Sequence, residues 1–248
     1  MPNFWKIVND TIHEADILLL LLDARLVEET RHEEIEEKVR EEGKVLIYVV
    51  TKSDLVKKES AEKWKRKLHP CVFVSAKERL GTTILRETIL MEAKRKGIVR
   101  EPLIVGVLGY PNVGKSSLIN ALSGRSAAST SILSGHTRGS QKIRMDNRIT
   151  ILDTPGVIPM GDKDRVKQTI IGTVDFTKSK APDMVCMELM RMFPGKIERY
   201  YGVEASDDKE KTIEDVAIKG KMMKKGGFPD IDRAARKIIK DWQSGKIK

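Results

Sequence analysis

"GYPNVGKSS", the stretch from Gly109 to Ser117, lies near the middle of a chain of 248 residues. It matches G-x-x-x-x-G-K-[ST], a loop between a strand and a helix whose backbone N–H groups bind nucleotide phosphates. In most small nucleotide-switch domains this loop follows the first strand. Here residues 1–108 precede it, so a large part of the fold must come before the loop.

Four apolar runs predict strands that are covered on both faces. They are "DILLLLLDAR" (16–25), "KVLIYVVTKSD" (44–54), "CVFVSAK" (71–77) and "LIVGVLGYPNVGKS" (103–116). Charged segments with helical spacing lie between them, and two of these end at Gly43 and Gly97, where a helix is expected to stop. This alternation predicts an α/β fold with a mainly parallel sheet.

The chain after the phosphate loop changes character twice. A helix is expected over 117–124, then a polar Ser/Thr/Gly-rich segment, then two strands joined at Asp146-Asn147. Strand-like runs stop beyond about residue 165. We therefore expect an α/β domain over residues 1–175 and a small, mostly α-helical domain over residues 176–248.

A phosphate loop alone leaves ATPases, kinases and GTPases open, but three further motifs favour a GTPase. "ILDTPG" offers Asp153 to hold Mg²⁺ through water, and Gly156, whose N–H could meet a γ-phosphate. "TKSD" offers Asp54, whose carboxylate can accept from both N1–H and the 2-amino group of guanine. "SAK" places the N–H of Ala76 where it could donate to guanine O6. Adenine lacks the pair of donors, N1–H and a 2-amino group, that Asp54 could bind.

The order of these motifs is unusual for a GTPase. The base-recognition motifs come first, followed by the phosphate loop, the switch segment and DTPG. Residues 1–108 are therefore expected to be the back half of a GTPase sheet, moved to the front by circular permutation. Domain termini often lie close together, and ligands of such sheets bind at the carboxyl ends of the strands whatever the chain order.

At this point the chain resembles the circularly permuted GTPases of the YlqF/RbgA-like family. The resemblance rests on "ADILLLLLDAR", "TKSD", "VSAK", "GYPNVGKSSLINAL", "SGHTRGSQ", "DTPG" and "GGFPDIDRAARKIIKDWQSGK". It implies hydrolysis of GTP to GDP and phosphate, a role in assembly of the large ribosomal subunit, and contact with that subunit or its precursor and its rRNA. A cytoplasmic protein is expected, with no membrane or DNA partner.

The resemblance also implies roles for individual residues. Lys115 reaches the β and γ phosphates, Ser116, Thr137 and Asp153 hold Mg²⁺, and Asn112 is a candidate K⁺ ligand. The implied catalytic set is Lys115, Thr137 and Gly156. The implied nucleotide contacts are Thr51, Lys52, Asp54, Ser75, Ala76, Lys77, Asn112, Val113, Gly114, Lys115, Ser116, Ser117 and Gly156.

Three departures from the pattern bear on nucleotide affinity or on catalysis. Thr51 stands where many GTPases have Asn, which removes an amide contact, and Val157 stands where Ras-like enzymes have the water-orienting glutamine. A Gly-His-Met segment of the bacterial relatives is absent from "MPNFWKIVND", and His13 and His136 are the nearest substitutes. The hypothesis is slow intrinsic hydrolysis that a partner accelerates. A nucleotide-gated RNA- or ribosome-binding module with negligible hydrolysis is the alternative.

Positive charge gathers at the end of the chain. Lys and Arg number 46 against 36 Asp and Glu, a net charge of +10. Residues 219–248 hold ten basic and three acidic residues, and ten minus three gives +7. Such a concentration suits contacts with an RNA backbone, although an evenly solvated helical surface is the other possibility. Trp242 could stack on an RNA base or pack inside the small domain.

Overall fold

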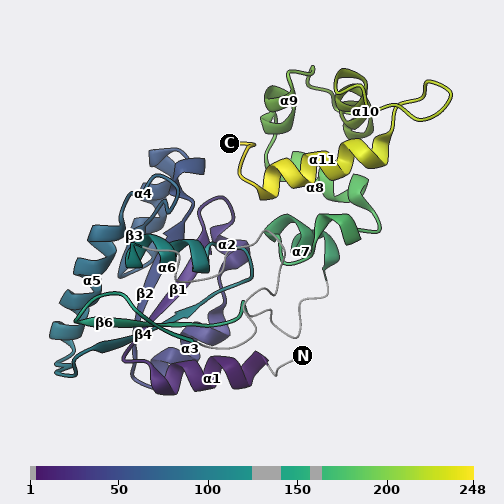
Figure 1. The fold of residues 1–248 in the computed structure, drawn as a ribbon. Coiled ribbons are helices and arrows are strands. Elements are labelled where there is room, and N and C mark those ends of the chain that lie inside the picture. The colour runs from purple at the N-terminus through teal and green to yellow at the C-terminus, as the bar shows by residue number, and fades with distance from the viewer. Residues whose placement is uncertain (1–3, 125–140, 157–163) are drawn as a thin grey trace. The chain divides into compact units, whose positions relative to one another are not determined.

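The computed structural model describes residues 4–124, 141–156 and 164–248. The chain divides into two compact units, Met1–Gly161 and Asp162–Lys248 (Figure 1). The division lies ahead of α7 (Arg165–Ile171), whereas the sequence placed it after residue 175. The reason is that α7 packs mainly on helices of the second unit.

The first unit is built on a six-stranded sheet. Its strands are β1 (Ile17–Asp23), β2 (Val45–Thr51), β3 (Cys71–Phe73), β4 (Leu103–Leu108), β5 (Gln141–Arg144) and β6 (Ile149–Asp153). The spatial order is β3-β2-β1-β4-β6-β5. Every neighbouring pair is parallel except β5 and β6, which form the hairpin expected around Asp146-Asn147. The predicted α/β fold with a mainly parallel sheet is confirmed.

The four apolar runs form the parallel strands because they are buried on both faces. All residues of β1 and β4 are buried. The register pairs Asp23 with Thr51 and Val107 with Asp153. The segments that follow the five parallel strands therefore leave the sheet at one edge, its carboxyl edge, which is where ligands of such sheets bind.

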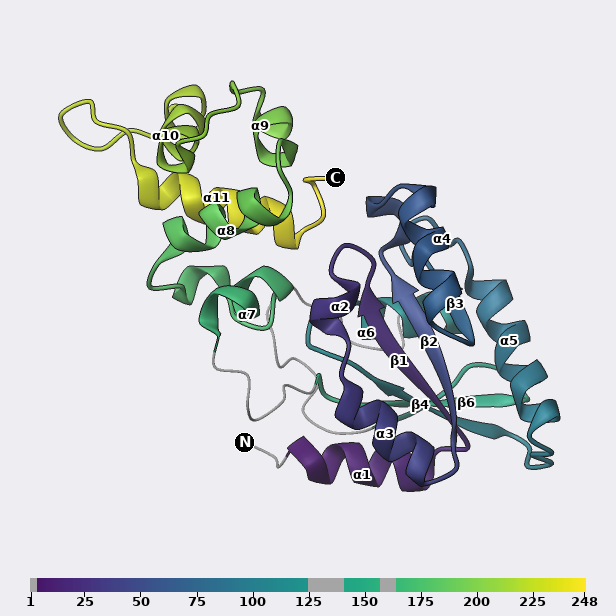
Figure 2. The same cartoon turned by 180° about the vertical axis from the view of Figure 1, so that it is seen from behind.

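Helices cover both faces of this sheet (Figures 1 and 2). They are α1 (Phe4–Glu14), α2 (Val27–Thr30), α3 (Glu33–Glu41), α4 (Lys58–Lys67), α5 (Thr82–Arg95) and α6 (Lys115–Ser123). Val8 and Ile12 of α1 and Ile35 of α3 pack with the even-numbered leucines of β1. Side chains alternate along a strand, so the opposite face is left to α5 and α6, which contact each other, β2 and β6.

Helix α4 is an element that sequence patterning missed. It reads "KESAEKWKRK" and has no buried residue, so its apolar spacing is too sparse to mark a helix. Trp64 is its one contribution to the core, packing from the helix against the cluster that includes Leu68 and Val50. The helix depends on this single anchor and on solvated charged residues.

The second unit is helical, as predicted. It contains α7, η2 (Phe176–Lys178), α8 (Pro182–Met192), α9 (Lys196–Tyr201), α10 (Lys209–Lys219) and α11 (Ile231–Gln243). Trp242 is 1% exposed, its indole N–H donates to the carbonyl of Ile170 at 3.0 Å, and its ring lies 4.6 Å from that of Phe193. Trp242 is therefore a core residue, which decides between the two roles left open for it.

Among the helices that the structure describes, none combines the length and the apolar character needed to cross a membrane.

Candidate nucleotide site at the carboxyl edge of the sheet

The phosphate loop lies between β4 and α6, and its glycines are required by its backbone. Gly109 has φ +147°, and a Cβ there would lie 2.8 Å from the carbonyl oxygen of Leu21. Gly114 has φ +104° and precedes α6 without giving it a side-chain cap. The N–H groups of the first turn of α6 therefore have no side-chain acceptor at the N-cap, which is the arrangement that binds phosphate at a helix N-terminus.

Lys115 is buried at the start of this helix. Its ammonium donates to two loop carbonyls, Gly109 at 2.8 Å and Tyr110 at 2.6 Å. Burial lowers the pKa of Lys115 to about 7, and the carboxylate of Asp153 only partly opposes this effect. A neighbouring polyphosphate would favour the charged form of the amine.

The DTPG segment lies against the phosphate loop. Gly156 is required there, because a Cβ would come within 2.7 Å of the Cα of Pro111. Thr154 fixes the segment to the sheet by donating its hydroxyl to the carbonyl of Val107 at 2.5 Å. The N–H of Gly156 is thus carried on a backbone that is held close to the loop, as its predicted role requires.

The surroundings of Asp153 indicate whether the site could hold a metal ion. The residue is 0% exposed, and neither carboxylate oxygen has a hydrogen-bond partner in the described parts of the chain. Burial raises the pKa of this carboxyl, and the side chain of Gln141 and the ammonium of Lys115 oppose that rise only in part. An unpartnered, buried carboxylate suits a cation, and Ser116 offers a hydroxyl at the first turn of α6. The residues present therefore fit Mg²⁺.

The type of ion follows from the donors. Within 4–124, 141–156 and 164–248, no group of three or more His, Cys, Asp or Glu side chains could hold a metal on its own. Mg²⁺ is commonly held by one or two protein oxygens together with phosphates and water. Thr137, the other predicted ligand, lies outside the described residues, as do His136 and Val157.

The two guanine-recognition motifs are hydrogen-bonded to each other. The hydroxyl of Ser75 donates to Asp54 Oδ1 at 2.6 Å and accepts from the N–H of Glu78 at 3.1 Å. The N–H of Ser53 donates to the carbonyl of Val74 at 3.3 Å. The Asp54 carboxylate is therefore held in place by the hydroxyl of Ser75, which bonds one of its oxygens.

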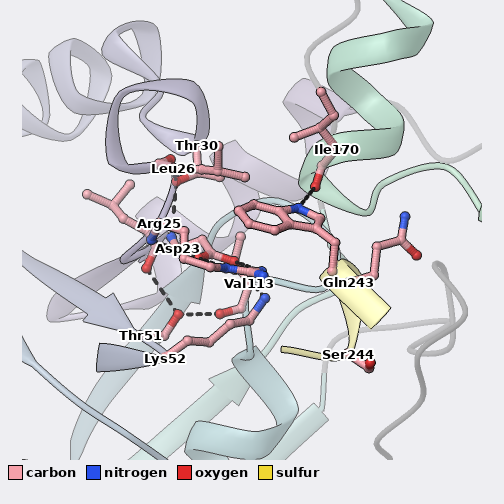
Figure 3. Close-up of polar contacts among 12 residues, drawn as sticks. Asp23, Arg25, Leu26, Thr30, Thr51, Lys52, Val113, Ile170, Gln243 and Ser244 are labelled. Carbon is pink, nitrogen blue, oxygen red and sulfur yellow. Dashed lines mark hydrogen bonds and ion pairs between the residues drawn. The ribbon is translucent and has the colours of Figure 1, made fainter. Parts of the chain in front are cut away.

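Thr51 connects the guanine-recognition motifs to the phosphate loop. Its buried hydroxyl donates toward the carbonyls of Leu22, at 3.0 Å, and of Val113 in the loop (Figure 3). Many GTPases place Asn at this position, and the sequence alone suggested only a lost amide contact. In the structure, the Thr51 hydroxyl makes a contact between the end of β2 and the phosphate loop, and this contact replaces the lost amide contact in part.

Lys52 is part of a buried ionic cluster that sequence analysis did not assign. Its ammonium lies 2.7 Å from Asp23 Oδ2, and Arg25 donates to the same carboxylate at 2.9 and 3.1 Å (Figure 3). Burial alone would raise the pKa of Asp23, but Lys52 and Arg25 outweigh it and hold that pKa well below its usual value. The sequence feature that could have indicated this cluster is the charged "DAR" at the end of a wholly apolar strand.

Lys52 also takes a conformation that points to a fixed role. Its φ is +55°, in the left-handed region that residues other than glycine seldom adopt. The ion pair with Asp23 holds the side chain at the carboxyl edge. The resemblance implied that Lys52 lies along the base. The described contacts pair its ammonium with Asp23, and Lys52 lies two residues before Asp54 in the same motif.

A cavity of about 440 Å³ opens beside these motifs. It is lined by Ala76, Lys77 and Arg79 from the loop after β3 and by Ser117, Asn120 and Ala121 from α6. The cavity thus lies between the motif that is expected to meet the base and the helix that is expected to meet the phosphates.

A family model described as "50S ribosome-binding GTPase" matches residues 104–223, which include the phosphate loop, DTPG and most of the second unit. The chain carries a GTPase domain of this family. Over 98% of its length it is 42% identical to an uncharacterised GTP-binding protein of Methanocaldococcus jannaschii. It is 33% identical, again over 98% of its length, to nucleolar GTP-binding protein 2 of Neurospora crassa.

Solved structures show the same fold. GNP-bound YlqF from T. maritima superposes with a TM-score of 0.66 at 23% identity, covering 98% of this chain and 94% of that one. The GTPase domain is therefore circularly permuted: strands β2 and β3, which lead into the candidate base-recognition motifs, precede the phosphate-loop strand β4 in the chain. The chain spans 65% of the Methanocaldococcus relative and 40% of the Neurospora relative.

Proposed function

We propose that this chain binds GTP, hydrolyses it to GDP and phosphate, and acts as a nucleotide-dependent switch in assembly of the large ribosomal subunit. One observation carries the proposal. Segments that match phosphate-binding and guanine-recognition motifs come from different parts of the chain but meet at one edge of one sheet, and Thr51 connects them directly. A phosphate loop in isolation would not specify a base.

On this proposal the phosphates lie over the N-terminus of α6. Backbone N–H groups from Asn112 to Ser117 surround them, and Lys115 leaves its loop carbonyls for the β and γ phosphates. Mg²⁺ would be held by Ser116 and Asp153, with Thr137 completing the shell, and would neutralise charge on the phosphates. The unpartnered carboxylate of Asp153 supports this assignment.

Guanine selection falls to Asp54 and to the backbone of Ala76. The Ser75 bond holds Asp54 so that its free oxygen can accept from the base. Lys52, fixed by Asp23, and Lys77 would flank the base plane. A buried site built around donors of one base rejects a base that lacks them, because its polar groups are then left unpaired.

The catalytic group is the incomplete part of this site. Lys115 and the N-terminus of α6 stabilise charge that develops on the phosphates, but a valine at position 157 has no group to orient water. We propose that the ribosomal partner orders the switch segment and completes the site. K⁺ near Asn112 would add positive charge where other GTPases use an arginine.

The partner is proposed from the relatives and from charge. The family model is that of ribosome-binding GTPases, and the Neurospora relative is a nucleolar GTP-binding protein. We place the activity in the cytoplasm and the rRNA contact on the basic second unit. Because the chain continues from Gly156 directly into that unit, γ-phosphate contacts at Gly156 could control RNA binding.

The proposal is tested by the rate of GTP hydrolysis in K⁺ buffer, with and without purified large ribosomal subunits from the same source. Stimulation that requires the subunit, and that is lost when Na⁺ replaces K⁺, is the expected result. Specific GTP binding without hydrolysis under either condition would favour the alternative, a nucleotide-gated RNA-binding module, for which Val157 is the best support. Absence of GTP binding would contradict both.

A further inference from the structure

A short hairpin interrupts the helical second unit between α10 and α11. It comprises Lys221–Pro229, "KMMKKGGFP", here called the basic hairpin. In Figure 1 this loop, drawn between α10 and α11, extends away from the helices of its unit. Its sequence stood out for its lysines and its paired glycines, and the nucleotide site makes no use of it.

The basic hairpin is held by its own backbone hydrogen bonds. Met223 and Pro229 form an antiparallel bridge, and the N–H of Lys224 donates to the carbonyl of Phe228 at 2.8 Å. At the base of the hairpin, the N–H of Asp230 donates to the carbonyl of Met222, whose side chain is buried. The tip is therefore presented on a closed, anchored turn.

An aromatic ring stands exposed at this tip. Phe228 is 71% exposed, the most exposed aromatic residue in the described parts of the chain. Gly226 and Gly227 have φ +93° and +81°, and a Cβ on Gly226 would lie 3.5 Å from the ring of Phe228. The two glycines allow the turn that brings the ring out. The ring is therefore open to contact with a partner.

The structure separates the basic residues of the C-terminal segment into two groups. Four are engaged within the unit: Lys219 with the Gly202 carbonyl, Arg236 with Asp232 and three carbonyls, and Lys237 and Lys246 with Asp241. Among the described residues, no partner is found for Lys221, Lys224, Lys225, Arg233, Lys240 or Lys248. Half of this free group lies in the basic hairpin.

We propose that the basic hairpin is a contact for single-stranded RNA, in which Phe228 stacks on an unpaired base while Lys221, Lys224 and Lys225 contact the flanking phosphates. The inference rests on the proposed function, which makes RNA the partner of the second unit, and adds the element and the form of RNA. Aromatic rings stack on bases of any identity, and lysines supply backbone contacts.

Charge and geometry favour this occupant. No Asp or Glu occurs between Lys219 and Pro229, so the charged side chains of the hairpin are all positive, which suits a polyanion. One exposed ring at a narrow turn can reach the face of a base only where that base is unstacked, as in loops, bulges and single strands. In a duplex the faces of each base are covered by the base pairs stacked above and below it.

The test compares how full-length variants bind a labelled single-stranded RNA and a duplex of the same length. The length is about 12 nucleotides, within the roughly 4–16 nucleotides that one single-strand-binding domain covers. Phe228→Ala should weaken binding to the single strand roughly 10-fold, since stacking is worth about 1–3 kcal/mol per base. Phe228→Trp should keep or improve it. Tyr200→Ala removes another exposed aromatic of the unit and should leave affinity unchanged.

Two further readouts separate stacking from charge. With 2-aminopurine in the RNA, the wild type and Phe228→Trp should change its fluorescence on binding and Phe228→Ala should not. Lys224→Ala with Lys225→Ala should lower the slope of log affinity against log salt by about 1.4, or 0.7 for each lost phosphate contact to a single strand. Thermal unfolding should be unchanged in every hairpin variant, because these side chains are exposed.

The outcomes are distinguishable. If the wild type binds neither this RNA nor large-subunit rRNA, the RNA partner of the proposed function is wrong and the inference falls with it. If the wild type binds and Phe228→Ala binds equally well, the inference alone is overturned. If Phe228→Ala weakens binding to intact subunits but not to naked RNA, the hairpin contacts protein and the RNA assignment is wrong.

Discussion

The two halves of the proposed nucleotide site differ in how their charges are compensated. In the guanine half, Asp23 is paired with Lys52 and Arg25, and Asp54 accepts from Ser75. In the phosphate half, neither oxygen of Asp153 accepts a hydrogen bond of ordinary geometry from the described residues, although Gln141 and Lys115 lower its pKa in part, and Lys115 donates only to carbonyls. On the proposed function, base recognition is therefore built in advance, whereas phosphate binding leaves opposite charges to be supplied by the ligand and its metal ion.

This difference assigns different duties to the two halves. A pre-bonded carboxylate gives selectivity because it loses little freedom on binding. A buried amine and an unpartnered carboxylate are costly until they are compensated. Nucleotide with Mg²⁺ should therefore stabilise the first unit through its phosphates while its base determines which nucleotide is accepted. The following predictions test this division.

The largest expected effect is a change of base preference in Asp54→Asn. The asparagine can still accept from Ser75, but it can donate to the 2-oxo group of xanthine and no longer accepts two hydrogen bonds from guanine. Preference for GDP over XDP should fall by roughly 10⁴-fold, as in sites that lose a built-in polar match. Isothermal titration calorimetry checks it. Asp10→Asn, an exposed carboxylate of α1, is the control, and an unchanged preference in Asp54→Asn would remove Asp54 from the site.

The next effect concerns the ionic cluster of the guanine half. Asp23→Asn leaves Lys52 and Arg25 beside a neutral group, and breaking a buried pair costs about 3–5 kcal/mol. Urea unfolding should show this loss in the free energy of unfolding. Glu28→Gln breaks an exposed pair with Lys67 at 3.9 Å and should change stability by less than about 1 kcal/mol. Similar losses of unfolding free energy in both variants would show that the buried cluster stabilises the fold no more than the exposed pair does.

A smaller effect tests the connection between the halves. Thr51→Val keeps the shape of the side chain but leaves the buried carbonyl of Val113 without its hydroxyl donor. We expect a loss of about 1–3 kcal/mol, seen as weaker GDP binding, whereas Thr51→Ser should bind like the wild type. If Thr51→Val and Thr51→Ser bind equally, the hydroxyl does not support the phosphate loop.

The smallest effect is a proton taken up with the nucleotide. The pKa of Lys115 is lowered by burial from 10.5 to about 7, so at pH 8 the free amine is largely neutral and phosphates should recharge it. Affinity for GDP should then fall with rising pH above 7, by up to about 1.4 kcal/mol per pH unit. At pH 8 the calorimetric heat should depend on the ionisation enthalpy of the buffer. Lys115→Arg, always charged, should show no such dependence.

The same pKa has a consequence for the nucleotide-free protein. Between about pH 7 and 10.5 the unfolded chain keeps the Lys115 proton and the folded chain does not. The unfolded state binds more protons in this window, so the contribution of Lys115 to the free energy of unfolding rises with pH. A fall over the same window that is absent from Lys115→Arg would contradict the assigned direction.

Much of the fold could be predicted because its strands are buried on both faces. A strand such as β1, with seven buried residues, leaves a continuous apolar run that few other structures produce. Motifs at the ends of such runs then share one sheet edge. By contrast, α4 could not be predicted, because a helix anchored by Trp64 alone leaves no apolar period.

The candidate site could be derived from the sequence where a motif carries its own chemistry, and less so where long-range contacts decide. Gly109–Ser117 and DTPG are local patterns. The pairing of Asp23 with Lys52 joins two strands that lie side by side only in the folded sheet. Neither residue alone therefore predicts the pair from the sequence. Trp242 offered two roles in the sequence, and only its burial and its bond to Ile170 decided between them.

The central claim is that these segments form one site for a guanine nucleotide. The most direct test is calorimetric titration of the full chain with GDP and with ADP in the presence of Mg²⁺. The account predicts binding of GDP at one site per chain and at least a 100-fold weaker binding of ADP, because adenine offers no donor pair to Asp54. Equal affinities for the two nucleotides would contradict it.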